Sequence, residues 1–448
     1  MTRIQATAMA ALALLVGATN AHARQSNPGE GVPDTIHYYE TVAMMSSAAE
    51  ASNQAQSGAG TVELSFETLG RHFDLKLEPH SPFAPGATVR WVDDTGSVVE
   101  PAGGGQFFRG RVDGDPNSWV RLTFRGDALA GVISTDDEMY FLEPASRFFG
   151  EEAAHETLAY RLSDTDTGMI PGSCGARAPS TLLRHRLAKV RASRQAMHEL
   201  IGNAATSVVA AASGNLLQAD VGIVADFSYF SKHGADSAND IAEIINNVDG
   251  IYQAQLGVTM QLLRTVVYST PDPFSTSTDP NTLLTSFSTW RSNNVSGPSA
   301  PLSGTDLSHL ITARDLNSTV IGIAYIDAVC DNTFGVGVDQ DFSTALNLMT
   351  LLLSHEMGHN FGAYHDAQAN PACPCCATSP PTFIMNPVIS GSLQNAFSDC
   401  SKSFILGPNA TGQAPTLQGF TCLASVAPPP PPSLTLNALS SPIVVGGP

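Results

Sequence analysis

The chain has 448 residues, of which 43% are hydrophobic, and its formal net charge is −19 at pH 7. This length allows two or three domains of ~150 residues, and this hydrophobic content excludes general disorder. The surplus of acidic residues disfavours nucleic acid as a partner, because phosphate backbones are bound by positive charge. The composition therefore describes an acidic, globular, multidomain protein without indicating its substrate.

Residues 1–23 have the pattern of a secretory signal peptide. Arg3 supplies the positive start, residues 8–16 are apolar, and Ala21, His22 and Ala23 form a small-x-small cleavage site. The apolar run is too short for a membrane span, and no other stretch of the sequence is long enough. We therefore expect a secreted, extracellular protein without a membrane span, in a compartment that permits disulfides.

A polar lead-in at residues 24–60 precedes a region that predicts an all-β domain. Between residues 61 and 145, short runs alternate apolar and polar side chains as half-buried strands do, and Gly, Pro and Asp cluster between them. The clearest runs are residues 62–66, 73–77 and 119–124. We expect one small antiparallel β domain, although an unrelated binding β-sandwich would give the same pattern.

The chain has seven cysteines, and six of them lie between residues 330 and 422. The seventh, Cys174, stands apart within the glycine-containing segment 171–176. An odd cysteine in a secreted protein is either unpaired or intermolecular. The basic stretch at residues 177–205 predicts a linker of the kind that proteases cut.

From residue 213 onward, strands alternate with helices, which predicts an α/β sheet. The expected strands are residues 216–224, 258–267, 307–311 and 320–325, and the expected helices are residues 236–256, 283–291 and 344–359. Prolines without periodicity follow residue 365, so we expect an irregular C-terminal lobe held by disulfides. Five consecutive prolines make residues 427–433 a stiff spacer before a short tail at residues 434–448.

The last expected helix carries a metal-binding pattern. His355 and His359 lie one helical turn apart on one face, so both imidazoles can bind one ion. Glu356 lies about 100° further round the helix and can reach a water on that ion instead of being a ligand. A mostly buried helix with unrelated histidines is the alternative interpretation.

Gly362 and His365 extend the pattern. His365 does not keep the helical phase, but a glycine can adopt φ > 0 and turn the backbone so that this third imidazole returns to the metal. Three neutral imidazoles with an open fourth position describe a catalytic zinc site, and zinc lowers the pKa of its water to roughly 7. We expect Glu356 to accept the proton of that water and pass it to a leaving amine.

This extended motif, with Asn360 and Asp366, resembles the reprolysin (adamalysin) branch of the metzincins, a family of zinc endopeptidases. Ile384, Met385, Asn386 and Pro387 supply the methionine turn of that group, and the similarity covers residues 213–424. The resemblance implies an α/β catalytic domain with a mixed twisted sheet. It also implies that Met385 forms the floor beneath the metal.

The β-rich region resembles the propeptide of the same family along residues 107–112, 129–133 and 140–144. It implies that residues 24–205 are a propeptide and that the protein is made as a zymogen, inhibited by that propeptide. A thiolate is a strong zinc ligand, so Cys174 in the fourth position would displace the water and silence the enzyme. This arrangement resembles the family's cysteine switch; an incidental free thiol is the alternative.

The resemblance also implies a disulfide between Cys330 and Cys422, which the chain-entropy model credits with roughly 4–5 kcal/mol. The family's cysteine before the methionine turn is replaced here by Phe383. Three pairings of the remaining four cysteines therefore stay open, namely those among Cys373, Cys375, Cys376 and Cys400.

Family members often bind a structural calcium ion far from the zinc. Asp220, Asp306 and the carbonyl of Cys422 stand where its ligands would be, and oxygen ligands suit calcium. Ser425 stands where the family has an asparagine, and two ordinary surface aspartates are the alternative.

The sequence thus predicts a secreted zinc endopeptidase that acts on proteins or peptides. A catalytically silent binding or adhesion protein with this fold is the rival from another class, and a metzincin of another branch is a third interpretation. Glu356 favours the enzyme, because a structural metal site has no use for that carboxylate. Specificity depends on loops at residues 388–396, so the substrate and the cleavage preference are not predicted.

Overall fold

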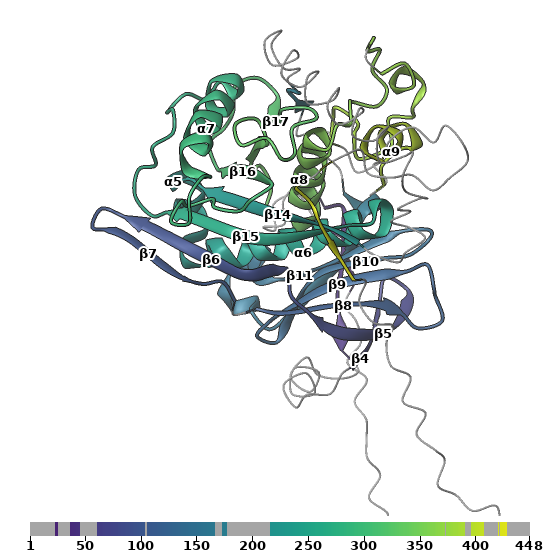
Figure 1. The fold of residues 1–448 in the computed structure, drawn as a ribbon. Helices are drawn as coiled ribbons and strands as arrows, with labels where there is room; N and C mark the ends of the chain where they lie inside the picture. The colour runs from purple at the N-terminus through teal and green to yellow at the C-terminus, as the bar shows by residue number, and fades with distance from the viewer. Residues whose placement is uncertain are drawn as a thin grey trace, which may run out of the picture.

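The computed structural model describes residues 23–25, 36–44, 61–103, 105–165, 173–176, 216–371, 373–389, 396–406, 420 and 422–427. Within these ranges an N-terminal β domain, residues 36–165, packs against a C-terminal α/β domain, residues 216–427 (Figure 1). The signal-peptide core, the linker at residues 177–205, residues 390–395 of the specificity loop, and the proline spacer and tail lie outside the described residues.

The β domain is built on an antiparallel sheet of ten strands. In spatial order they are β1 (Ala23–Gln25), β2 (Tyr38–Thr41), β12 (Thr157–Arg161), β11 (Met139–Pro144), β10 (Ala128–Ser134), β9 (Trp119–Arg125), β8 (Gln106–Val112), β5 (Arg71–His80), β4 (Val62–Thr68) and β3 (Ala43–Met44). β4 alternates buried and exposed side chains as the sequence predicts. β10 and β11 are instead buried on both faces, because the C-terminal domain covers their second face.

The C-terminal domain contributes six described strands to a mixed sheet. The short β19 (Ala424–Val426) runs antiparallel to its single neighbour, and the other five form the body of the sheet. They are β14 (Leu216–Ala225), β15 (Val258–Tyr268), β16 (Leu307–Thr312), β17 (Val320–Ala324) and β18 (Val336–Gln340). They pair in parallel except β17, which runs antiparallel to β18. Four of these strands match the expected ones, whereas β18 was not predicted, because five residues that include a glycine give little periodicity.

Helices cover both faces of this sheet. α6 (Ser237–Leu256) and α8 (Leu346–Asn360) share a core with the β domain, and α7 (Pro280–Asn294) packs with the aromatic cluster of the opposite face. α6 ends at Gly257, whose φ of 66° is the left-handed conformation that glycine adopts readily. Two short helices, α5 (Phe227–His233) and α9 (Asp399–Leu406), complete the domain.

One hairpin corrects the predicted domain boundary. β6 (Phe83–Asp93) and β7 (Gly96–Pro101) lie in the stretch expected to form the β domain alone, yet β6 pairs in parallel with β15 of the C-terminal sheet. The prediction of a single separate antiparallel domain between residues 61 and 145 is therefore wrong for this hairpin. The physical reason is that β15 would otherwise be an edge strand with unpaired backbone groups.

The C-terminal domain contains three disulfides. Cys330 is bonded to Cys422, as the family resemblance implies. The structure pairs Cys373 with Cys376 and Cys375 with Cys400, which selects one of the three pairings left open by the sequence. Among the helices that the structure describes, none has the length and apolar character needed to cross a bilayer.

Candidate metal centre

The site begins on helix α8, whose residues are buried along its whole length. Gly358 lies between the two histidines of the helix, and the methionine turn packs directly on it. A Cβ atom added at Gly358 would lie 2.7 Å from the Met385 sulfur and 3.0 Å from the Phe397 ring. The lack of a side chain at Gly358 therefore allows Met385 to lie under the helix, a role that the sequence analysis did not assign.

The chain turns sharply where α8 ends. Gly362 has φ of 106°, a region that favours glycine, and its amide donates to the carbonyl of His359 at 2.8 Å. The Ala363 amide closes the same turn on the Gly358 carbonyl at 3.0 Å. This turn brings His365 back toward the two histidines of the helix.

The three imidazoles meet at one point. The Nε2 atom of His359 lies 3.1 Å from Nε2 of His355 and 3.1 Å from Nε2 of His365. Nitrogen ligands of tetrahedral zinc, at ~2.0–2.1 Å from the ion, lie roughly 3.3 Å from one another. The spacing of the three nitrogens therefore fits a single zinc ion.

Hydrogen bonds at Nδ1 fix the tautomers of His355 and His359. Nδ1 of His355 donates to the Ile384 carbonyl at 2.7 Å, and Nδ1 of His359 donates to the Ala363 carbonyl at 2.8 Å. Carbonyl oxygens only accept, so these protons sit on Nδ1 and leave lone pairs on Nε2. Bonds of this kind orient metal-binding histidines.

The site favours neutral imidazoles. Burial, reinforced by His365, lowers the pKa of His355 to about 3, and burial lowers the pKa of His365 to about 4. Burial likewise lowers the pKa of His359 well below its usual value. Neutral imidazole is the form that binds metal, so the donor set suits zinc chemically as well as geometrically.

Glu356 lies next to this cluster, fully buried. Its side chain packs so closely on β17 that a Cβ atom at Gly322 would lie 2.3 Å from Oε1. The Cys174 thiol contacts this carboxyl group, and no other described residue hydrogen-bonds to its oxygens. Burial and then the charge of Asp339 raise the pKa of Glu356 well above its ordinary value, which suits a group that exchanges protons.

Cys174 reaches the same cluster from outside the C-terminal domain. The short strand β13 (Ser173–Cys174) pairs in parallel with β17, and the Gly175 amide donates to the Gly322 carbonyl at 2.9 Å. On its other side, the Cys174 amide donates to the Pro387 carbonyl at 2.9 Å. The free Cys174 sulfur lies 3.4 Å from Nε2 of His359 and within 4.8 Å of every other ligand atom of the cluster.

A buried network that the sequence analysis missed supports the end of α8. Asn360 donates to the carbonyls of Tyr325 at 2.8 Å and Val336 at 3.1 Å, and its Oδ1 lies 3.1 Å from Nε2 of His309. Nδ1 of His309 lies 2.7 Å from Asp339. Only the family-like Asn360 signalled this network, because the partners come from three separate segments.

Asp220 and Asp306, two of the predicted calcium ligands, lie side by side and are hydrogen-bonded to each other. The Asp220 amide donates to the Asp306 carboxylate at 2.8 Å, and the Asp306 amide donates to the Asp220 carbonyl at 2.7 Å. The Asp306 carbonyl accepts from the Cys330 amide at 3.0 Å, so the disulfide to Cys422 adjoins this pair. Among the described residues, neither aspartate belongs to a group of three or more side chains able to hold a metal.

Three neutral imidazoles beside a buried carboxylate, on an α/β domain, are features of the class of zinc-dependent hydrolases. Comparison with known proteins supports the same class. Residues 219–406 match the model of the reprolysin (M12B) family of zinc metalloproteases. Trimerelysin-2, a snake venom metalloproteinase of Protobothrops flavoviridis, is 30% identical over 187 residues, which are 41% of this chain and 87% of the relative.

A second relative, the snake venom metalloproteinase TM-1 of Protobothrops mucrosquamatus, is 32% identical over 184 residues, or 40% of this chain and 85% of the relative. The chain therefore belongs to the reprolysin family of metzincin zinc metalloproteases and is a metalloendopeptidase.

Proposed function

We propose that the protein is a secreted zinc endopeptidase made as a zymogen, with Glu356 as general base and Cys174 as the group that keeps it latent. The observation that carries this proposal is the convergence of four donor atoms, three imidazole nitrogens and the Cys174 sulfur, beside the buried carboxylate of Glu356.

His355, His359 and His365 would hold the zinc ion. Bound zinc supplies Lewis-acid polarisation of the scissile carbonyl and makes the attacking water more acidic. Glu356 accepts a proton from that water at its carboxylate and donates it to the leaving nitrogen. The carbonyls of Ile384 and Ala363 keep two of the imidazoles in the required orientation throughout.

The slot between β17 and the methionine turn would bind the substrate backbone. Residues 173–175 now lie extended in this slot and are hydrogen-bonded on both sides. A peptide substrate would gain the same main-chain bonds by adding a strand to the edge of β17. The N-terminal segment would therefore exclude substrate, and its Cys174 sulfur would be the fourth ligand of a bound zinc ion.

Latency through Cys174 requires that its thiol lose its proton and bind the metal as a thiolate. Burial and then the charge of Glu356 raise the pKa of the Cys174 thiol well above its usual value, so a thiolate forms here only beside a cation. Zinc would supply that cation, since coordinating thiols lose their protons. We propose that residues 24–205 act as the propeptide and that cutting within residues 177–205 starts activation.

Secretion rests on the signal-like residues 1–23, on the three disulfides and on the venom relatives. Disulfides persist in oxidising compartments, and the two relatives are described as venom proteins.

We further propose that Asp220 and Asp306, with the Cys422 carbonyl, bind a structural calcium ion. Burial raises the pKa of Asp306 to about 7, which a calcium ion would offset.

The first prediction concerns the general base. Glu356→Ala and the isosteric Glu356→Gln should keep the zinc content and the fold but lower kcat for peptide cleavage by roughly 10²–10⁴-fold or more, because proton transfer is lost. Zinc analysis, circular dichroism and a fluorogenic peptide assay on the cut protein measure these quantities. Unchanged cleavage by either variant would reject this role for Glu356.

The second prediction concerns latency. The intact chain should be weakly active, and Cys174→Ala should give activity without any cut, because the fourth ligand position becomes free. Ser173→Ala is the matched control, since it alters the same strand but keeps the thiol and should stay latent. If folded Cys174→Ala is as inactive as the parent, the thiol is not the switch, and physical covering of the slot explains latency instead.

The third prediction concerns calcium and pH. A carboxyl with a raised folded-state pKa stabilises the fold below its unfolded pKa, and this contribution is lost as the pH rises through about 7. Calcium needs the carboxylate, so calcium at ~100 times its Kd should raise Tm by roughly 5 °C or more at pH 8 and by less at pH 5.5. Asp306→Asn should remove the calcium effect, and equal Tm values with calcium and with chelator at pH 8 would contradict the site.

A further inference from the structure

Helix α6 is amphipathic, yet both of its faces are covered. Its apolar face packs in the core that the C-terminal domain shares with the β domain. A polar stripe runs along the opposite face at steps of three and four residues and consists of Asp240, Glu243, Asn246, Asp249, Gly250 and Gln253. The β domain covers this polar stripe, although polar residues at such positions usually face water.

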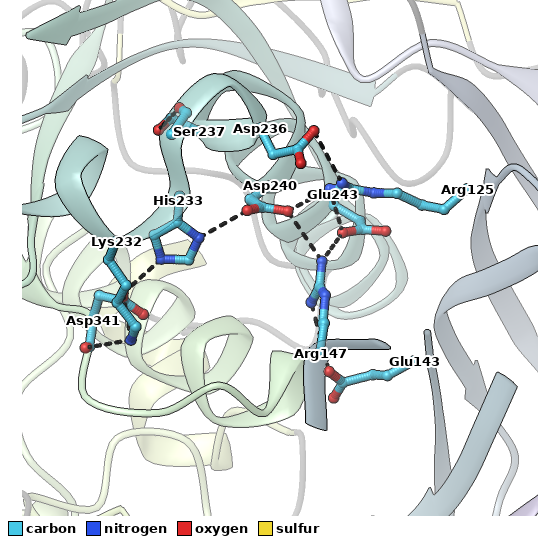
Figure 2. Close-up of polar contacts among 11 residues, drawn as sticks. Arg125, Glu143, Arg147, Lys232, His233, Asp236, Ser237, Asp240, Glu243 and Asp341 are labelled. Carbon is cyan, nitrogen blue, oxygen red and sulfur yellow. Dashed lines mark hydrogen bonds and ion pairs between the residues drawn. The ribbon is translucent and has the colours of Figure 1, made fainter. Parts of the chain in front are cut away.

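Two arginines of the β domain hold one end of the polar stripe. Arg125 from β9 and Arg147 from helix α2 (Ser146–Phe149) both form ion pairs with Asp240 and Glu243 (Figure 2). Arg125 lies 3.0 Å from Glu243, and Arg147 lies 3.2 Å from Asp240. Glu243 is fully buried and the two arginines are mostly buried, so water weakens these pairs less than it weakens surface pairs.

Arg121 holds the other end. Its guanidinium donates to Asp249 through Nε at 3.1 Å and Nη2 at 2.8 Å, and Nη2 also reaches Gln253 at 2.5 Å. Between the two ends, Asn246 donates to the Leu122 carbonyl of β9 at 3.4 Å. The contacts therefore run the length of the stripe.

The carboxylates of the stripe are positioned by their own domain. One oxygen of Asp249 accepts from the Thr259 hydroxyl at 2.7 Å, which leaves the other for Arg121. Asp240 likewise offers one oxygen to His233 at 2.8 Å and the other to the arginines (Figure 2). Because these carboxylates are already held in place, less side-chain entropy is lost when the two domains associate.

Shape complementarity and backbone pairing add to the charges. Trp119 of β9 packs so closely on α6 that a Cβ atom at Gly250 would lie 2.3 Å from its ring. Strand β6 runs along the free edge of β15 with a parallel register from Leu262 opposite Phe83 to Tyr268 opposite Val92 (Figure 1). None of the described residues in these contacts belongs to the metal centre.

We propose that this surface, the polar stripe of α6 together with the edge of β15, holds the β domain on the C-terminal domain after the linker is cut, independently of Cys174. The partner is the chain's own N-terminal domain, retained as a non-covalent complex. Polar atoms of Glu243 and Asn246 stay without partners in the described structure, so this face can also hydrate when the domains separate. The proposal rests on the proposed function only in that cutting of the linker is the natural event.

The experiment uses the full chain with a site for a sequence-specific protease placed within residues 190–195. After complete cutting, gel filtration without denaturant should elute both pieces together, for the parent and for Cys174→Ala alike. Separation of the pieces in the parent would overturn the proposal. Separation in Cys174→Ala alone would show that the thiol, and not this surface, holds the domains.

Substitutions then locate the surface. Arg125→Ala and Arg147→Ala should each raise the Kd between the pieces by roughly 30-fold or more, since each leaves buried carboxylates less well paired. Arg71→Ala is the matched control, because Arg71 pairs with Asp137 inside the β domain and should leave the Kd unchanged. An unchanged Kd for both test variants would reject the arginine contacts.

Gly250→Ala tests the same surface from the catalytic side. Alanine is the better helix former, so the C-terminal domain should fold at least as well, while the added methyl group meets Trp119 and weakens the complex. If the Kd between the two pieces is the same for Gly250→Ala as for the parent, Trp119 does not pack on Gly250 in the complex. Peptide cleavage measured on the same samples separates the two proposals: cleavage by the uncut parent rejects latency, while co-elution still decides the docking surface.

Discussion

The Nε2 atoms of His355, His359 and His365 converge on one point, and the surrounding chain is arranged to hold their lone pairs there. Without a cation these lone pairs repel one another, so the arrangement persists only if the surrounding chain holds it or a metal ion binds there. The enforcement is visible at each residue. The Ile384 and Ala363 carbonyls orient two rings, Gly362 turns the chain, and Gly358 lets Met385 pack beneath the helix.

The catalytic sheet is covered by the N-terminal part of the chain at both of its edges. Strand β13 pairs with β17 beside the metal centre, whereas β6 pairs with β15 at the far edge. The first contact bears on chemistry, because it fills the slot and brings the Cys174 sulfur to the histidines. The second bears on association, because it joins two domains through backbone bonds and buried ion pairs on α6.

Much of the site was predictable because its signals are local. The spacing of His355 and His359 follows from helical geometry, and the turn after the helix requires a residue such as Gly362. The α/β order of strands and helices also follows from local periodicity, as α6 and β15 illustrate. Each of these features depends on residues close together in the chain.

The features that were missed depend on distant partners. The pattern of residues 83–101 indicates strands but not which sheet they join, and that sheet contains residues far along the chain. The polar stripe of α6 looks like a solvent face, because the domain that covers it lies more than a hundred residues earlier. The crowding of Cys373, Cys375 and Cys376 left their pairing open for the same reason, since spacing alone does not select Cys400 as a partner.

We propose that Cys174 completes the metal centre of the intact chain. X-ray absorption at the zinc edge, recorded on the uncut zinc-loaded protein, measures the ligand set directly. We expect three nitrogen neighbours at ~2.0–2.1 Å and one sulfur neighbour at ~2.3 Å, with the sulfur lost in Cys174→Ala. A spectrum of the intact chain with only nitrogen and oxygen neighbours would contradict it.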